Sequence, residues 1–288
     1  MKKIRADLLL TERGLADSPA RAKALIMAGS VASAGRRVEK AGELLPADAP
    51  LAVEPTSPFV GRGGLKLAEA LDAFGVSPAG RTCADIGVST GGFTDCLLQG
   101  GAARVFAVDV SIRQIDDRLR RDPRVVLIEK NARNLRPKDF SAAVGLAVMD
   151  VSFISILKIL PALAEVFRAG RMAVPDPILL SLIKPQFEAE KGFIGPRGIV
   201  RDPAVHAEVL TRIAWDARLA GFRIRDLLRL KTRGQKGNQE FFARFAFKPA
   251  EEGGGRIRLE PLPKDVLEWI SAAVQGGGFT ESGGGCSG

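Results

Sequence analysis

Seven short apolar segments alternate with segments of helical pattern between residues 60 and 248 of this 288-residue chain. They lie at 81–86, 104–108, 125–128, 146–149, 178–183, 223–229 and 241–247. Short apolar strands separated by helices predict an α/β fold with a doubly wound, largely parallel sheet. No good helical pattern separates the last two segments, so we expect them to pair as an antiparallel edge.

The first forty residues differ from the rest in charge and predict a small domain of their own. Residues 2–40 hold nine Lys or Arg against four acids. The pattern predicts two short helices and a tight hairpin, at 7–13, 19–28 and 31–38, with Ser18 as the N-cap of the second helix. Arg21, Lys23, Arg36 and Arg37 would then lie on or beside one exposed face.

Composition shifts mark the remaining boundaries. Residues 41–60 are rich in proline, which predicts a linker near 55–60. Three consecutive glycines at 253–255 predict a second joint, followed by a short helix over 263–274 and a flexible glycine-rich end. We therefore expect three parts, at residues 1–57, 58–250 and 251–288.

The net charge of +9 favours a polyanionic partner such as nucleic acid. No apolar run reaches the roughly 20 residues that cross a membrane, and the N-terminus does not resemble a signal peptide, so we expect a cytoplasmic protein. Three cysteines without metal-ligand spacing and a single histidine, His206, predict no metal site and argue against a Ser-His-Asp hydrolase. His206 is expected to be structural or on the surface.

A glycine-rich loop at residues 84–95 joins the first predicted strand of the sheet to a helix. Its pattern, G-x-S-T-G-G, departs from the dinucleotide motif G-x-G-x-x-G. Asp85 would repel a pyrophosphate but would suit a cationic cofactor, and Asp109, at the end of the next strand, can accept hydrogen bonds from ribose hydroxyls. We therefore predict S-adenosylmethionine, with a plain strand-to-helix turn as the alternative. The predicted cofactor residues are Asp85, Gly87, Ser89, Thr90, Gly91, Gly92, Phe93, Asp109 and Asn131; Asn131 is equally explained as a turn residue.

Four charged residues stand where the ends of the predicted strands should open into a crevice: Lys66, Asp150, Lys184 and Glu240. Lys184 follows an apolar strand, where a charge is costly unless it is paired, and Asp150 is the natural partner. One explanation for these charged residues is a structural ion pair. The other is catalysis, because neighbouring ammonium groups make it easier for one lysine to lose its proton and act on a hydroxyl group.

Other residues have weaker indications. A basic run before Glu240, which includes Arg233 and Lys236, predicts either a phosphate-binding rim or a solvated loop. Phe93, Phe153 and Phe187 flank the motifs; they are candidates for walling the cofactor or a flipped nucleotide, but core packing is the favoured role for each. The full set of predicted RNA contacts is Arg5, Arg21, Lys23, Arg36, Arg37, Arg62, Arg233 and Lys236.

These motifs together resemble a known family over residues 3–248. Lys66, Asp150, Lys184 and Glu240 match the Lys-Asp-Lys-Glu tetrad of FtsJ-like ribose 2′-O-methyltransferases. The phrases GRGGLKL, DIGVSTGGFTDCLLQGGA, VMDVSFISI, LIKPQFE and GNQEFF look like the TlyA (haemolysin A) family. The first domain resembles the alpha-L RNA-binding motif of ribosomal protein S-four.

The resemblance implies a Rossmann-like methyltransferase domain that methylates the ribose of a cytidine in ribosomal RNA, on one or both subunits. The chain departs from the family pattern at Gly61, where a serine is usual, at Ala20 in Ser18-Pro19-Ala20-Arg21, and in the tail after residue 253. A non-catalytic assembly factor or lytic protein is the alternative function. Base methylation would require a different motif at Asp150-Val151-Ser152-Phe153.

Overall fold

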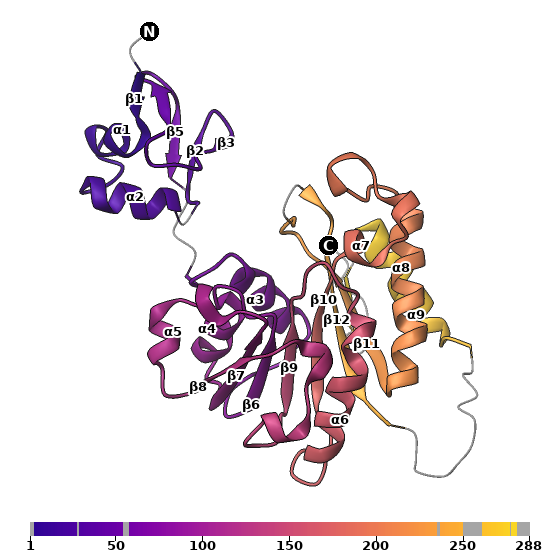
Figure 1. Ribbon diagram of the computed structural model, residues 1–288. Helices are drawn as coiled ribbons and strands as arrows, with labels where there is room; N and C mark the ends of the chain where they lie inside the picture. The colour runs from indigo at the N-terminus through magenta and orange to yellow at the C-terminus, as the bar shows by residue number, and fades with distance from the viewer. Residues whose placement is uncertain are drawn as a thin grey trace. The chain divides into compact units, whose positions relative to one another are not determined.

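A computed structural model describes residues 3–27, 29–53, 58–234, 237–249, 261–276 and 278–280. The chain divides into two compact units, Met1–Gly61 and Arg62–Gly288, each with its own core (Figure 1). Among the described residues, no helix is long and apolar enough to cross a membrane.

The first unit is a small α+β domain. Its helices are α1 (Ala6–Glu12) and α2 (Pro19–Met27), and its strands are β1 (Lys3–Arg5), β2 (Val31–Ser33), β3 (Arg36–Arg37), β4 (Leu44–Pro46) and β5 (Leu51–Val53). β1 pairs with β4, and β3-β2-β5 form an antiparallel sheet.

Local sequence signals set the elements of this unit. The Ser18 hydroxyl accepts a hydrogen bond from the Arg21 N–H at 3.2 Å, which confirms the predicted N-cap. Ala34 and Gly35, with φ of 49° and 74°, make the tight turn of the predicted hairpin. Leu10 and Ile26, from the two helices, are buried together in the core.

The second unit is built on an eight-stranded sheet in the order β13-β11-β12-β10-β9-β6-β7-β8. The strands are β6 (Thr82–Ile86), β7 (Arg104–Asp109), β8 (Val125–Glu129), β9 (Leu146–Met149), β10 (Ile178–Ile183), β11 (Phe222–Arg229), β12 (Phe241–Phe247) and β13 (Gly278–Thr280). The strands β6 to β10 run parallel to one another, whereas β12 runs antiparallel to both β10 and β11. The predicted α/β class and all seven predicted strands are confirmed.

Helices connect and cover these strands. They are α3 (Gly63–Ala73), α4 (Gly92–Gln99), α5 (Asp117–Arg121), α6 (Leu160–Gly170), α7 (Pro185–Glu188), α8 (Pro203–Asp216) and α9 (Lys264–Gln275). Short 3₁₀ turns are η1 (Ile112–Gln114), η2 (Ala132–Asn134), η3 (Pro137–Asp139), η4 (Ile156–Lys158), η5 (Lys191–Phe193), η6 (Pro196–Gly198) and η7 (Ala217–Ala220). Figure 1 shows α8 and α9 side by side near β11.

The expected antiparallel edge needs a correction. β11 and β12 do pair, but β13 adds a further strand outside β11. The reason lies in the segment expected to be a tail. Val266, Trp269, Ile270 and Ala273 recur at helical spacing on α9 and are buried in the core, so the helix packs against the sheet and returns the chain to its edge.

Candidate active site

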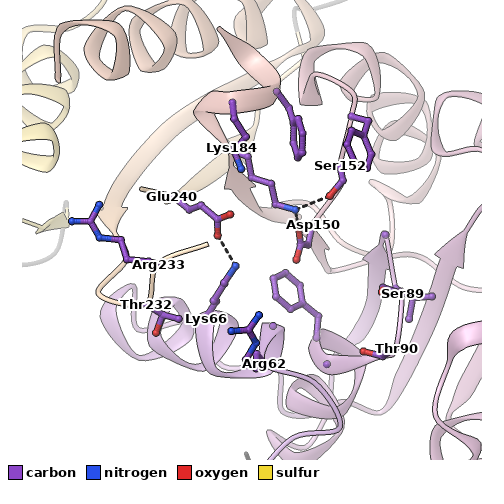
Figure 2. A pocket seen from close by; sticks show the side chains of 18 residues that line it. Arg62, Lys66, Ser89, Thr90, Asp150, Ser152, Lys184, Thr232, Arg233 and Glu240 are labelled. Atoms are coloured by element: carbon purple, nitrogen blue, oxygen red, sulfur yellow. Dashed lines mark hydrogen bonds and ion pairs between the residues drawn. The ribbon is translucent and has the colours of Figure 1, made fainter. Parts of the chain in front are cut away.

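A cavity of about 500 Å³ opens in the second unit where the parallel strands end (Figure 2). Its volume lies within the usual range of small-molecule sites. The residues around it come from distant parts of the chain: Arg62, Gly63, Lys66, Gly87, Val88, Ser89, Thr90, Gly92, Phe93, Asp150, Ser152, Phe153, Lys184, Gln186, Phe187, Thr232, Arg233 and Glu240.

The sheet register brings three of the four predicted charged residues together. Met149 pairs with Ile86 on one side and Ser181 on the other, so Asp150, the next residue, lies at the carboxyl edge. Lys184 follows Ile183, which pairs with Phe241 of the antiparallel β12. Because β12 runs antiparallel to β10, it starts at the edge where β10 ends, and Glu240, the residue before β12, lies at that same edge.

The four charged side chains form two ion pairs inside the cavity. Lys184 Nζ lies 2.5 Å from Asp150 Oδ1 and donates to Ser152 Oγ at 3.0 Å. This confirms the predicted pairing of Lys184 with Asp150. Lys66, from α3, lies with its Nζ 2.5 Å from Glu240 Oε2. Figure 2 shows the two lysines reaching toward the cavity from different elements.

The two pairs differ in burial. The Glu240 side chain is 3% exposed, whereas that of Asp150 is 23% exposed. Gly234 makes room for Glu240, since a Cβ there would overlap its carboxylate. Glu240 therefore depends on Lys66 for its charge balance, while Asp150 also meets solvent.

With Arg62 and Arg233, the lining holds four cations and two carboxylates, so its net charge attracts anions.

The glycine-rich loop runs from β6 into α4 and forms one wall of the cavity. Gly87 and Gly91 have φ of 93° and 96°, and Ser89 has 49°. A Cβ on Gly87 would overlap the Asp150 carbonyl oxygen, so glycine is required there for the loop to pack against the end of β9. Asp109 fixes the loop by accepting a hydrogen bond from the Ser89 N–H at 2.9 Å.

Asp85 is fully buried and is not among the residues that line the cavity. Thr94 Oγ1 donates to its Oδ2 at 2.7 Å, and its Oδ1 has no hydrogen-bond partner among the described residues. Burial raises the pKa of Asp85 to about 7, and the neighbouring Asp150 and Asp109 add to this effect. The carboxylate therefore lies behind the loop, where a nearby positive charge would favour its ionised form.

Three other predicted cofactor residues also lie outside the cavity lining: Gly91, Asp109 and Asn131. Asp109 also accepts from the Ser111 N–H at 3.2 Å, so both carboxylate oxygens already hold the backbone. Asn131 caps η2 by accepting from the Arg133 N–H at 3.1 Å, which is the turn role left open from the sequence.

The three phenylalanines have different environments. Phe93 is 3% exposed and stacks on Phe242 with ring centroids 5.8 Å apart. Phe153 is 89% exposed, so the expectation of core packing is wrong for this residue. Its backbone is left-handed, with φ of 63°, and its ring lies 4.9 Å from that of Phe187.

The predicted RNA contacts fall in both units. In the first, Arg21, Lys23 and Arg37 are exposed, while Arg5 pairs with Asp7 at 2.7 Å and Arg36 pairs with Glu43. In the second, the exposed Arg62 and Arg233 line the cavity. Lys236 lies outside the described residues.

The remaining expectations concern residues away from the cavity and residues that the motifs missed. His206 is buried, with its Nε2 3.2 Å from the Val200 carbonyl oxygen, so it is structural. No cluster of His, Cys, Asp and Glu suited to a metal ion occurs in the described part of the chain. Sequence reasoning did not single out Ser152, Gln186 or Thr232, because neutral polar residues next to motifs give no charge signal.

Comparisons with known proteins agree with this architecture. Residues 59–247 match the family model described as FtsJ-like methyltransferase. The chain is 41% identical to the 16S/23S rRNA (cytidine-2′-O)-methyltransferase TlyA of Mycobacterium tuberculosis, over 84% of this chain and 89% of that protein. It is 36% identical to Hemolysin A of Brachyspira hyodysenteriae, over 84% and 99%. A solved protein of Streptococcus thermophilus, which its name describes as a candidate haemolysin, is 37% identical with a TM-score of 0.70, over 96% and 97%.

Proposed function

The chain belongs to the FtsJ-like methyltransferase family and, within it, to the TlyA (haemolysin A) group, and on this basis we propose that it methylates the ribose 2′-hydroxyl of a cytidine in ribosomal RNA. The observation that carries the proposal is the meeting of Lys66, Asp150, Lys184 and Glu240 in one cavity beside the glycine-rich loop. The substrate is taken from the name of the mycobacterial relative.

The methyl donor of the family is S-adenosylmethionine, and the cavity fits it. The orphaned Oδ1 of the buried Asp85 suits a positively charged group nearby. Backbone from Gly87 to Thr90 and the amino end of α4 would hold the cofactor, and Asp109 fixes that backbone by accepting from the Ser89 N–H. When bound, the cofactor supplies an already activated methyl group on a sulfonium.

Lys184 is the residue best placed to act on the ribose hydroxyl. An ammonium group has three N–H donors. One is donated to Ser152, and Asp150 lies 2.5 Å from the amine as its ion-pair partner, so donor capacity remains for the substrate. Lys184 then either holds the hydroxyl with a lone pair facing the methyl donor or, when neutral, takes up its proton. Lys66 and Glu240 form the opposite wall and fix the position of the ribose.

The remaining residues bind RNA. Arg62 and Arg233 at the cavity contact phosphates beside the target nucleotide. The alpha-L motif binds another part of the folded RNA through Arg5, Arg21, Lys23, Arg36 and Arg37. Lys236 belongs to the same proposed rim as Arg233. The exposed Phe153 offers a face on which an unstacked base can rest. A protein that modifies ribosomes works in the cytoplasm.

The test is methyl transfer with purified components. Small and large ribosomal subunits from cells lacking this protein are incubated with it and labelled S-adenosylmethionine, and the digested RNA is analysed by mass spectrometry. We expect label on the sugar of a cytidine at a site that is unmethylated in those cells and methylated in cells that have the protein. Label on a base, or none on either subunit, would refute the proposal.

Calorimetry with the cofactor separates the alternative function from the proposed one. A non-catalytic assembly factor or lytic protein has no need of S-adenosylmethionine, so binding of the cofactor favours the enzyme. Absence of binding at millimolar cofactor would favour the alternative.

A further inference from the structure

The segment between Asp150 and Ile156 supplies three residues of the cavity wall: Asp150, Ser152 and Phe153. Ser152 accepts from Lys184 Nζ at 3.0 Å, so the position of the segment sets the direction of the amine. Phe153 holds a left-handed backbone that costs free energy and, at 89% exposure, gains little from packing. Other contacts must therefore hold the segment in this shape.

Both ends of the segment are anchored. At the first end, the Asp150 N–H donates to the Ile86 carbonyl at 2.9 Å, within the sheet. At the other end, the Ile156 N–H donates to Glu188 Oε1, also at 2.9 Å, and this bond is buried. Ile156 also packs in the core, but among the described residues the only hydrogen bond of its N–H goes to this one side chain, from a residue 32 positions away in sequence.

Glu188 is the last residue of α7, the one-turn helix that begins directly after Lys184. The same short element therefore carries the amine and holds the segment that contains both of its partners, Asp150 and Ser152. The Glu188 carbonyl oxygen in turn accepts from Arg212 of α8, which fixes the end of the helix.

The burial of Glu188 indicates a role beyond filling space in the core. The residue is 5% exposed, and its Oε2 has no hydrogen-bond partner among the described residues. Burial raises the pKa of its carboxyl group, an effect that Ser155 and the Ile156 N–H partly offset. A buried carboxylate is costly, and an apolar side chain of similar size is commonly tolerated in such a place. An apolar side chain would leave the Ile156 N–H without an acceptor.

We propose that Glu188 is a positioning residue for methyl transfer: by accepting from the Ile156 N–H, it holds Ser152 against Lys184 and so directs the Lys184 amine at the substrate. The inference rests on the proposed function of the site. It assigns to Glu188 no contact with substrate or cofactor. Loss of the anchor would misplace the amine, and misplacement by about 1 Å can cost about 100-fold in rate.

The experiment compares Glu188→Leu, which removes the acceptor and fills the space, with Glu188→Gln, which keeps an uncharged acceptor. Single-turnover transfer is measured at saturating RNA and cofactor, with cofactor affinity by calorimetry and Tm as separate readouts. We expect Glu188→Leu to lose about 10- to 100-fold in transfer rate with cofactor affinity unchanged, and Glu188→Gln to recover most of that loss. Glu190→Gln, an exposed acid two residues further on, is the matched control.

A wild-type transfer rate in Glu188→Leu would overturn the inference, as would equal losses in Glu188→Leu and Glu188→Gln. Should Glu188→Leu not fold, Glu188→Asp keeps the charge but shortens the reach by one methylene, and an unchanged rate in that variant would also overturn it. Failure of the proposed function is distinct, because the wild type and Glu190→Gln would then transfer no methyl group to RNA either.

Discussion

Replacement of Lys184 by alanine tests the proposed chemistry most directly. Lys184 lies between Asp150, its ion-pair partner, and Ser152, its hydrogen-bond acceptor, and an N–H not donated to Ser152 is assigned to the ribose hydroxyl. Proton transfer or orientation by a positioned side chain contributes about 10²- to 10⁴-fold. The expected loss in transfer rate is therefore about 2.7–5.4 kcal/mol of transition-state stabilisation.

The same substitution has a calculable effect on stability. It leaves Asp150 without its ion-pair partner, but 23% of that side chain is exposed, so water replaces part of the lost interaction. We expect a cost of about 1–3 kcal/mol. For a unit of this size, Tm should fall by roughly 2–4 °C for each kcal/mol, so the Tm of the variant is measured beside its transfer rate.

The assay is single-turnover transfer of labelled methyl to ribosomal subunits, with calorimetry for the cofactor. We expect Lys184→Ala to bind S-adenosylmethionine as the wild type does and to transfer the methyl group at least about 100-fold more slowly. Lys158→Ala, which removes an exposed lysine of η4, is the control. A transfer rate within about threefold of wild type, a difference of less than 1 kcal/mol, would refute the role of Lys184. An equal loss of cofactor affinity would refute the assignment of cofactor binding to the glycine-rich loop and of catalysis to Lys184.

Three further predictions follow from burial, backbone and charge. Lys66→Ala should lower the free energy of unfolding by about 3–5 kcal/mol in denaturant titrations, more than Lys184→Ala, because it leaves the Glu240 carboxylate, at 3% exposure, without its ion-pair partner. Adding Glu240→Gln should recover much of this loss. Equal effects of the two lysine substitutions would contradict the burial argument. Burial raises the pKa of Asp85 from 3.8 to about 7, so between about pH 4 and pH 8 the folded protein binds more protons than the unfolded chain. The stability contributed by this group therefore falls as pH rises through that range. Asp85→Asn should therefore gain stability relative to the wild type, by about 4 kcal/mol between about pH 4 and pH 8, and a constant difference across that range would exclude the effect. Arg37→Ala should weaken RNA binding and lower the salt slope by about one in filter-binding titrations, whereas an unchanged slope would remove Arg37 from the phosphate contacts.

Several features of this protein follow from local sequence alone. Short apolar segments bounded by turns gave the strands because a buried parallel strand must be apolar on both faces. Ser18 and the Ala34-Gly35 pair set a helix start and a hairpin because capping and positive φ depend on neighbouring residues only. The pairing of Lys184 with Asp150 could be expected because a charge after an apolar strand requires a partner.

Other features depend on which segments the fold brings together. The antiparallel insertion of β12 between β10 and β11 places Glu240 against Lys66, and strand order is a non-local property that no window of sequence reports. Asp85 lies behind the loop and Phe153 outside the core because a residue's burial depends on what packs over it, which neighbours in sequence do not determine. The sequence by itself determined which residues supply the charges of the site and which glycines allow the positive φ angles of its loop. The tertiary structure alone decided their partners and exposure, because hydrogen bonds and desolvation act between atoms that are close in space, whatever their separation along the chain.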